Sequence, residues 1–390
     1  MTAQPLADLR VIEGSAFVAA PLGGMTLAQL GAYVIRFDQV GGGLDMRRWP
    51  LAPTGQSLFW AGLNKGKRSI QVDLRTAEGR ELVEALVGAA GIFLTNFPAR
   101  GWLAYEALRE RRPDLIMCAL TGNPDGSSEV DYTVNPSSGF PSAMGPRHSV
   151  VPTNSLMPAW DTIMGGLAVV GLLAALRHRE ATGEGQLVEI ALSDVAFATV
   201  GHLGRIAEVQ LEGTDPVPDG NYLYGAFGGD FLCRGDRRVM IVALTSRQWK
   251  ALKVATETEE MFDAVAAATG HDFSDEAGRY LGRNLIRELL KPWFAQHTLD
   301  EIRASLAGTG VSWGPYQTFK QLVEEDPRCS EANPMFSMVE HPVGTYLTPA
   351  SPLNFSVSGR VPAKPSPHLG EHTDEVLAEL TSAGEQAAAP

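Results

Sequence analysis

The sequence predicts an α/β protein in which a large domain, built on a parallel sheet, is interrupted by a smaller α+β domain. Over the first 200 residues, short apolar runs of strand length alternate with segments of helical period, as in the crossover units that build parallel sheets. A linker-like stretch rich in Gly, Pro and Asp, at 213–220, then precedes a hairpin pattern. With 390 residues, 44% of them hydrophobic, the chain can bury the cores of two such domains.

Six apolar runs are the expected strands of the large sheet, and they lie at Leu9–Ile12, Tyr33–Phe37, Ser69–Leu74, Gly91–Thr95, Leu115–Leu120 and Leu187–Ala191. Helices are expected between them at Leu22–Leu30, Ala77–Val87 and Leu103–Glu110. The second helix is amphipathic, because Glu78, Glu81 and Glu84 lie opposite its leucines. A further helix, Met164–Leu176, is apolar nearly all round and is therefore expected to be buried in the core.

The smaller domain is expected at residues 209–333. It begins with a hairpin of Phe231–Cys233 and Val239–Leu244 around a Gly-Asp turn signal. Helical patterns follow at Arg247–Thr256, Ser274–Gln296, Leu299–Leu306 and Phe319–Glu325. Residues 1–208 are the first part of the large domain, and residues 334–390, with a last helix at Thr373–Leu380, are expected to return to it.

Charge and cysteine usage exclude several classes of protein. A formal net charge of −13 argues against a nucleic-acid binder, which needs a basic face. Cys118, Cys233 and Cys329 are too few and too widely spaced for a disulfide framework, so we expect a reducing compartment, the cytoplasm. The longest charge-free stretch, 14–35, contains four glycines and a proline, and neither a membrane span nor a secretion signal is expected.

The common motifs of nucleotide and hydrolase chemistry do not fit the sequence. Residues 62–68 approach a phosphate-binding loop, but only three residues separate the glycines, and Arg68 stands where a magnesium-binding Ser or Thr is needed. No Gly-x-Gly-x-x-Gly follows a strand, and neither His-Glu-x-x-His nor Gly-x-Ser-x-Gly occurs. His368 and His372 have helical metal spacing, but Pro367 and Gly370 beside them argue against a helix, and no metal site is expected.

Candidate ligand-binding residues follow the strand expected at Gly91–Thr95. Open parallel sheets bind ligands at the carboxyl ends of their strands, and this strand is followed by Asn96, Phe97 and Arg100. Further charge-assisted contacts to phosphate are expected from cations near other strands, namely Arg36, Lys65, Lys67 and Arg68. Spacing alone leaves open that these cations are simply solvated.

Asp161 precedes the long apolar helix at a natural N-cap position, so its plain interpretation is a helix cap. The functional interpretation is a carboxylate, ionised near neutral pH in an apolar cleft, that acts as a nucleophile without a general base. Farther along, Gly225, Gly228 and Gly229 belong to a glycine-rich turn. This turn is either a hairpin connection or a mobile lid over a reactive intermediate.

Six stretches together resemble the family III CoA-transferases, the family of formyl-CoA transferase and the 2-methylacyl-CoA racemases. They lie at residues 27–36, 64–74, 95–97, 161, 182–186 and 369–377, and the resemblance spans residues 8–377. It implies a Rossmann-like large domain formed by both chain ends, a smaller inserted domain and two subunits interlocked in a homodimer. It also implies an enzyme acting on an acyl-CoA, with no other cofactor and no metal.

The same resemblance implies roles for individual residues. Asp161 matches the aspartate that attacks the acyl-CoA thioester. Asn96 and Phe97 match the stretch that holds the adenine end of CoA, and Phe17 and Arg36 match further CoA contacts. The expected CoA site is completed by Lys67, Arg68, Arg100 and Tyr132, and the lid by Gly225, Gly228 and Gly229.

Departures from the family pattern reduce the number of reactions that we expect of this chain. Racemases have Gly-His-Asp where this chain has Glu129-Val130-Asp131, and valine cannot exchange a proton, so racemisation is disfavoured. The run of glycines expected in the lid is interrupted by Ala226 and Phe227. Five further stretches are similar to members that move CoA between the two carboxyl groups of mesaconate, within one molecule, in 3-hydroxypropionate metabolism. They lie at 11–25, 57–68, 96–102, 128–136 and 220–228.

Two points stay open at the level of sequence. Transfer of CoA to a separate acid would use the same aspartate as transfer within one molecule. Retention of a free dicarboxylate requires a cation, for which Arg47 or Arg48 is the candidate. The same pair could instead bind a CoA phosphate or form a surface ion pair.

Overall fold

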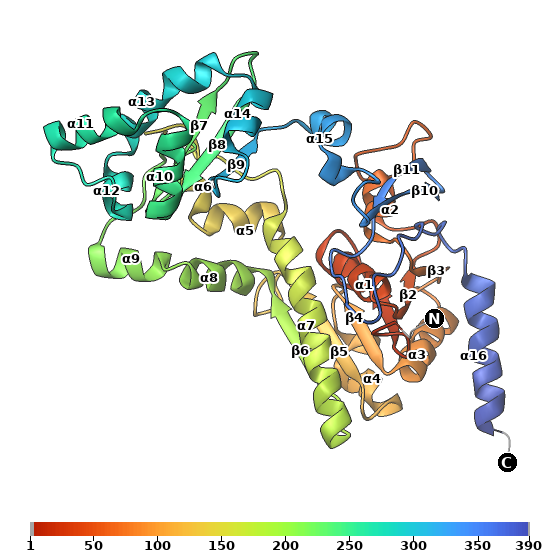
Figure 1. Cartoon of the computed structure of the whole chain (residues 1–390). Coiled ribbons are helices and arrows are strands. Elements are labelled where there is room, and N and C mark those ends of the chain that lie inside the picture. Colours follow the sequence, from red (N-terminus) through yellow and green to blue (C-terminus); the bar gives the residue numbers. More distant parts are fainter. Residues whose placement is uncertain (1–3, 389–390) are drawn as a thin grey trace. The chain divides into compact units, whose positions relative to one another are not determined.

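Both ends of the chain contribute to the first of two structural units in the computed structural model (Figure 1). Unit 1 comprises Met1–Gly139, Asn154–Thr214 and Pro327–Pro390, and unit 2 comprises Phe140–Thr153 and Asp215–Asp326. The structure describes residues 4–388, and side chains to residue 382. Residues 1–3 and 389–390, which the expected large domain includes, lie outside this range. The unit boundaries fall at 214 and 326 instead of 208 and 333, and residues 140–153 join unit 2.

Six parallel strands form the sheet of unit 1, as the apolar runs predict. They are β1 (Arg10–Gly14), β2 (Tyr33–Asp38), β3 (Arg68–Gln71), β4 (Ile92–Thr95), β5 (Ile116–Thr121) and β6 (Leu187–Ala191). Their order is β3-β2-β1-β4-β5-β6, which confirms the Rossmann-like fold class. The strand order reverses between β1 and β4, where Glu13 pairs with Leu94 and Gly14 with Thr95.

The remaining elements of unit 1 cover this sheet and extend it. The helices are α1 (Ala19–Gln29), α2 (Leu58–Leu63), α3 (Ala77–Ala90), α4 (Tyr105–Arg111), α5 (Asp131–Ser137), α7 (Ala159–Thr182), α8 (Leu192–His202), α9 (Arg205–Glu212) and α16 (Thr373–Ala388). Three short 3-10 turns are η1 (Leu44–Arg47), η2 (Gly101–Leu103) and η3 (Pro327–Cys329), and the hairpin is β10 (Phe336–His341) with β11 (Gly344–Pro349).

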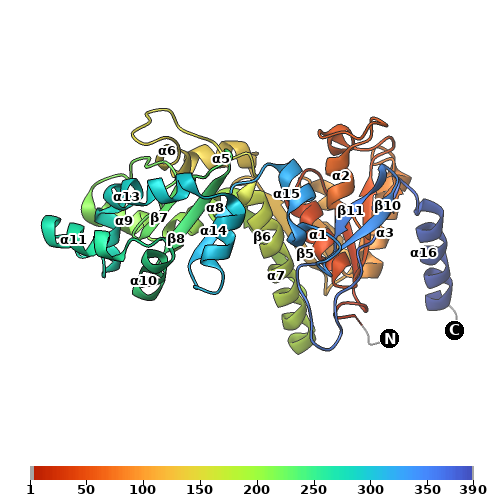
Figure 2. The same cartoon turned by 45° about the horizontal axis from the view of Figure 1, so that its top comes forward.

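The C-terminal segment rejoins the N-terminal strands, as Figure 2 shows for β10, β11 and α16. Its attachment to β3 consists of backbone and side-chain hydrogen bonds. The backbone N–H of His372 donates to the Ser69 carbonyl at 2.9 Å, and the N–H of Gly370 donates to Ser69 Oγ at 3.0 Å. His372 Nδ1 in turn accepts from the Ser69 N–H at 3.2 Å. His372 therefore serves to join the two ends of the chain.

Helix α3 is amphipathic as expected, with Val83, Leu86 and Val87 in the core of the sheet and its glutamates toward solvent. Thr76 caps its start by accepting a hydrogen bond from the Gly79 N–H. Its end turns at Gly91, whose φ of 68° is the left-handed conformation that favours glycine. The turn leads directly into β4 and so fixes where that strand begins.

Helix α7 is buried on one face only, which corrects the expectation of a helix surrounded by core. Met164, Ala168 and Leu172 are buried, and α7 packs on α1 and β5. Leu167 and Val170 on its other face are 42% and 61% exposed. By length and composition alone, with a mean hydropathy of 1.7, α7 would pass as a membrane span. The core helix of a folded domain passes the same test, and the packed face of α7 is typical of such a helix.

Unit 2 is an α+β unit with an antiparallel sheet of order β7-β8-β9. Its strands are β7 (Phe227–Leu232), β8 (Arg238–Ala243) and β9 (Ser312–Pro315). Its helices are α6 (Phe140–Ala143), α10 (Ser246–Ala255), α11 (Glu259–Thr269), α12 (Glu276–Leu281), α13 (Arg283–Gln296), α14 (Leu299–Leu306) and α15 (Phe319–Glu325). The single helix expected at 274–296 is divided at Gly282 into α12 and α13. Aromatic side chains, among them Phe231, Trp249 and Phe294, form its core.

A pair of neighbouring glycines in α7 tests how closely this helix must approach α1. A Cβ at Gly165 would lie 2.8 Å from the Ala19 carbonyl oxygen, whereas a Cβ at Gly166 would meet nothing within 4 Å. We expect Gly165→Ala to lower stability by about 1–3 kcal/mol through overpacking. Gly166→Ala should leave it unchanged or raise it by up to about 1 kcal/mol, because alanine favours helix. Thermal denaturation of both variants measures this, and equal effects would contradict the packing described.

Candidate active site

The carboxyl ends of β1 and β4 lie side by side at the point where the strand order reverses, which is where open parallel sheets bind ligands. The loops that leave the two strands are joined by the side chain of Asn96. Its Oδ1 accepts from the Ala16 N–H at 2.9 Å, and its Nδ2 donates to the Ala16 carbonyl at 2.8 Å. Both ends of the Asn96 amide thus hold the loop after β1, which gives this residue a structural role at the expected CoA site.

Phe17 and Phe97 lie in these two loops, directly after Ala16 and Asn96. Phe17 has a φ of 65°, uncommon for a bulky residue, and its side chain is 37% exposed. Phe97 lies partly buried against the ring of Phe37, with ring centroids 6.0 Å apart. Two aromatic rings therefore remain partly exposed at this edge of the sheet, together with the exposed Arg100 that follows them.

Arg48 lies across the aromatic ring of Phe17. The guanidinium carbon is 5.5 Å from the centroid of the Phe17 ring and 4.9 Å from that of Phe59, so that two aromatic rings contact one cation. Ser57 Oγ donates to the Arg48 carbonyl at 2.6 Å and fixes the backbone there. Its neighbour Arg47 is exposed. Of the two arginines that the sequence offers, Arg48 is the one held in place.

Arg36 and Lys67 lie inside unit 1 instead of on a ligand-binding surface. Both side chains have no exposed area. Arg36 pairs with Asp38 at 2.8 Å and with Asp45 at 2.9 Å, and Lys67 pairs with Glu13 at 2.8 Å. The expectation that these two cations touch CoA phosphate is therefore corrected, because their donors are already used by buried acids.

The acids around Arg36 raise the pKa of its guanidinium, although burial alone would lower it. Burial lowers the pKa of Lys67 to about 8, and the nearby carboxylate of Glu13 opposes that shift. Lys65 is also buried, and burial lowers its pKa to about 8. Arg68, which is more exposed, pairs with Glu375 at 3.2 Å and lies over the Tyr33 ring.

Asp161 lies in the first turn of α7 and is partly buried. It does not cap the helix, because a different carboxylate does. Asp131 Oδ2, from the start of α5, accepts from the backbone N–H of Trp160 at 2.8 Å and from that of Asp161 at 3.0 Å. Asn135 Oδ1, one turn along α5, accepts from Trp160 Nε1 at 3.0 Å. The expected capping role thus belongs to Asp131, and the carboxylate of Asp161 is left for another purpose.

The pKa of Asp161 is raised to about 7, first by burial and then by the nearby charge of Asp131, while the charge of Arg48 lowers it. This carboxyl therefore differs from an exposed aspartate, which is fully ionised near neutral pH. A more basic carboxylate is a better nucleophile, and strongly shifted pKa values are concentrated at functional sites. Tyr132, 40% exposed on α5, donates its hydroxyl to the Leu156 carbonyl at 3.2 Å.

The expected glycine lid of unit 2 is in fact partly a strand. Gly228 and Gly229 are buried in β7 and pair with Val242 and Ile241 of β8, and only Gly225, with a φ of 79°, lies in the preceding turn. The Leu223 N–H donates to the Gly228 carbonyl at 3.0 Å, which ties the turn to the strand. A loop of free glycines is therefore replaced by a hydrogen-bonded strand end.

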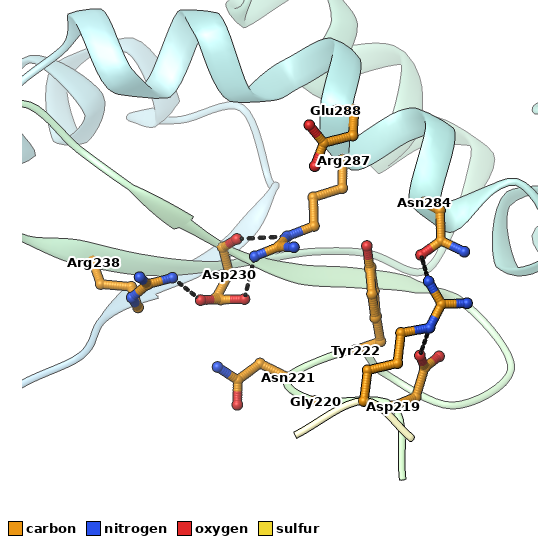
Figure 3. A pocket seen from close by; sticks show the side chains of 10 residues that line it. Asp219, Gly220, Asn221, Tyr222, Asp230, Arg238, Asn284, Arg287 and Glu288 are labelled. Atoms are coloured by element: carbon orange, nitrogen blue, oxygen red, sulfur yellow. Dashed lines mark hydrogen bonds and ion pairs between the residues drawn. The ribbon is translucent and has the colours of Figure 1, made fainter. Parts of the chain in front are cut away.

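A cavity of about 530 Å³ opens beside this strand within unit 2 (Figure 3). Its charged side chains pair with one another. Asp230 lies between Arg238 and Arg287, and Asp219 binds Arg147 at 3.0 Å on one side and Arg283 at 2.7 Å on the other. The lining itself has three acids, Asp219, Asp230 and Glu288, and three arginines, Arg147, Arg238 and Arg287. Because these formal charges balance, this cavity is a weaker candidate for an anionic substrate than the edge of the sheet in unit 1.

Sequence reasoning singled out Asp161 as the candidate nucleophile but missed Asp131 and Phe59. Asp131 stands in a segment that the sequence analysis used only for comparison with family members, and nothing in local spacing connects it to a helix start 30 residues later. Phe59 follows Ser57, the cap of α2, in a short helix that the periodicity did not reveal. Among the side chains that the structure describes, up to residue 382, no group of three or more from His, Cys, Asp or Glu could hold a metal ion.

Comparisons with known proteins identify the family of this chain. The model of CoA-transferase family III matches residues 6–373. The 2-methylfumaryl-CoA isomerase of Chloroflexus aurantiacus is 55% identical over 386 residues, which cover 97% of this chain and 94% of that protein. The succinyl-CoA:mesaconate CoA-transferase of Haloarcula hispanica is 28% identical and covers 96% of each chain.

A solved structure supports the same assignment. A CAIB/BAIF family protein from Brucella suis matches with a TM-score of 0.80 at 28% identity, over 97% of this chain and 99% of that one. The family model, a close relative and this solved structure each extend over both units. This chain, in which the carboxyl of Asp161 in the first turn of α7 has a raised pKa, is an enzyme that belongs to CoA-transferase family III.

Proposed function

We propose that this enzyme is a 2-methylfumaryl-CoA isomerase, which moves CoA from one carboxyl group of mesaconate to the other. The observation that carries the proposal is Arg48, a cation held between Phe17 and Phe59 whose charge acts on the Asp161 carboxyl. A nucleophile with a fixed cation beside it suits an acyl group that ends in a second carboxylate. The relative at 55% identity carries the same activity in its name.

In the first half of the reaction, the Asp161 carboxylate attacks the thioester carbonyl of mesaconyl-1-CoA. A mixed anhydride forms and CoA leaves as the thiolate. The thiolate then attacks the Asp161 carbonyl, so that mesaconate is released with one oxygen from the aspartate, and the enzyme carries an aspartyl-CoA thioester.

In the second half, the other carboxylate of mesaconate attacks this thioester. The bond to sulfur breaks, a second anhydride forms and CoA leaves again as the thiolate, which then attacks the mesaconyl carbonyl to give mesaconyl-4-CoA. The Asp161 carboxylate is restored, and it now holds the oxygen that bridged the anhydride. Asp161 alone supplies the nucleophile in both halves, and we propose that neither a metal nor a redox cofactor takes part.

Retention of mesaconate between the two halves is what makes the enzyme an isomerase. Holding it on Arg48 makes the second attack intramolecular, with an effective molarity on the order of 10⁵ M or more for well-oriented groups. An outside acid then competes poorly. The alternative is a transferase that releases mesaconate and accepts a separate acid, and it is supported by the name of the Haloarcula relative.

We place the CoA moiety along the edge where β1 and β4 end. The exposed parts of Phe17, Phe97 and Arg100 offer aromatic faces and a cation to the adenine and phosphate groups, and Arg68 and Tyr132 are further candidates. Racemisation is disfavoured, since Val130 stands where a base would be needed.

We also propose a homodimer, interlocked as in the family, that works in the cytoplasm in 3-hydroxypropionate carbon fixation. The dimer is supported by apolar side chains on exposed faces of α7, α8 and α9 of unit 1, which a partner subunit would cover: Leu167, Val170, Phe197, Leu203, Ile206 and Leu211. The cytoplasm is supported by the free thiols of Cys118, Cys233 and Cys329.

Labelled free mesaconate distinguishes the isomerase from the transferase. The enzyme is incubated with unlabelled mesaconyl-1-CoA in the presence of isotopically labelled mesaconate, and the products are separated and weighed by mass spectrometry. We expect mesaconyl-4-CoA without label, because the bound acid reacts before it can exchange. Label in the product would establish the intermolecular transferase, and no conversion at all would point to another acyl group.

Arg48→Met tests which cation holds the distal carboxylate, with Arg47→Met as the matched control. We expect Arg48→Met to raise KM about tenfold or more and to release free mesaconate, since a charge-assisted hydrogen bond contributes about 1.5–3 kcal/mol. Arg47→Met should change KM less than about twofold, because its side chain is exposed. Steady-state kinetics are measured at about pH 9, where Asp161 is ionised in each variant. A larger effect at Arg47 than at Arg48 would overturn the assignment.

A further inference from the structure

Asp131 holds the first turn of α7 from a separate helix. The Asp131 side chain is 2% exposed, and one of its oxygens accepts from two backbone N–H groups, those of Trp160 and Asp161. Such N–H groups in the first turn of a helix have no acceptor within the helix, and here Asp131 supplies one. Asp131, on α5, therefore binds the backbone N–H of the proposed nucleophile itself.

Few charges act on the Asp161 carboxyl. Those that do belong to Asp131, on α5, and to Arg48, in the loop after η1. Helix α1, packed along α7, has no ionisable side chain, and β5 offers only the buried thiol of Cys118, whose pKa burial raises to about 12. The other titratable side chains on elements packed against α7 are Tyr132 on α5, Glu189 on β6, and Asp194 and His202 on α8. None of these four is among the charges that act on the Asp161 carboxyl.

We propose that Asp131 is a positioning residue with a second role, in which its negative charge favours transfer of CoA onto Asp161. The proposal rests on the proposed function, in which Asp161 becomes an aspartyl-CoA thioester. When that thioester forms, the carboxylate of Asp161 becomes neutral and its negative charge passes to mesaconate, which Arg48 holds. The repulsion between the Asp131 and Asp161 anions then ends, so the covalent intermediate is stabilised relative to the free carboxylate.

The same repulsion makes Asp161 more basic, and hence more nucleophilic once it is ionised. Burial contributes in the same direction, since the neutral thioester suits a partly buried site better than an anion does. A simple cap would need only an acceptor oxygen at this place, and an asparagine would serve. Unlike an asparagine, a carboxylate here also repels the anion of Asp161.

Asp131→Asn separates the two roles, because its amide oxygen can still accept both N–H groups while the charge is gone. We expect the acid limb of kcat/KM to move toward lower pH by about one unit. The ratio of kcat/KM at pH 6 to that at pH 8 would then rise about fivefold over the wild-type ratio. The matched control is Asp125→Asn, an exposed aspartate of unit 1 that accepts from the Ser127 N–H at 2.9 Å, and its profile should equal the wild type.

A second measurement follows the intermediate. Each protein is mixed with mesaconyl-1-CoA, quenched in acid and weighed intact, so that the CoA adduct is counted directly. We expect Asp131→Asn to hold at least about threefold less adduct than the wild type and the Asp125→Asn control. A wild-type pH profile together with a wild-type amount of adduct in Asp131→Asn would overturn the proposal and leave Asp131 as a cap only.

Two further results keep the proposal testable if Asp131→Asn does not fold. The wild-type enzyme alone should show an acid limb near pH 7, and a limb near pH 4 would contradict the proposal. Asp161→Ala addresses the proposed function separately, because it should abolish both turnover and adduct. If Asp161→Ala stays active, the proposed function fails; if it is inactive while Asp131→Asn behaves as the wild type, only the present inference fails.

Discussion

The arrangement of the site depends on the ion pairs of Arg36, a guanidinium with no contact to solvent. It donates to the Ser15 carbonyl at 3.1 Å and to Asp45 at 2.9 Å. Ser15 begins the loop that carries Phe17, and Asp45 lies in η1, three residues before Arg48. One buried cation thus fixes the two loops that meet where Arg48 lies over Phe17. Such buried charges add little net stability, but removal of one partner costs about 3–5 kcal/mol, so the pairs set geometry more than they stabilise the fold.

Around Asp161, in contrast, the neighbouring charges act on one carboxyl in opposite directions. Arg48 favours the anion of Asp161, whereas burial and Asp131 disfavour it, and the balance is a pKa of about 7. When the distal carboxylate of an acyl group pairs with Arg48, the charge that favours the anion is neutralised, and Asp161 becomes more basic with substrate bound. In the proposed reaction each negative charge has a place at every step: on Asp161 before attack, and beside Arg48 once mesaconate is free.

How far the sequence predicts this structure depends on the distance between interacting residues. The six parallel strands are predicted because their apolar runs are local, and so is α3 with its cap and its terminal glycine. Asp161 was located through a resemblance, yet its cap comes from Asp131, a contact that local spacing cannot show. Arg36 and Lys67 look like solvated cations in the sequence, because nothing marks the buried acids that face them. Gly228 and Gly229 read as a turn, but pairing with β8 makes them a strand.

The central claim is that the carboxylate of Asp161 forms covalent bonds during turnover, and its oxygens report this directly. Mesaconyl-1-CoA is prepared with a heavy oxygen isotope in its free carboxylate, turned over in ordinary water, and the peptide that contains Asp161 is analysed by mass spectrometry. Because the oxygen that bridges the second anhydride stays on the aspartate, we expect one heavy oxygen on Asp161 after a single turnover and up to two after several. Formation of mesaconyl-4-CoA with no label on Asp161 would contradict it, since CoA would then have moved without passing through the aspartate.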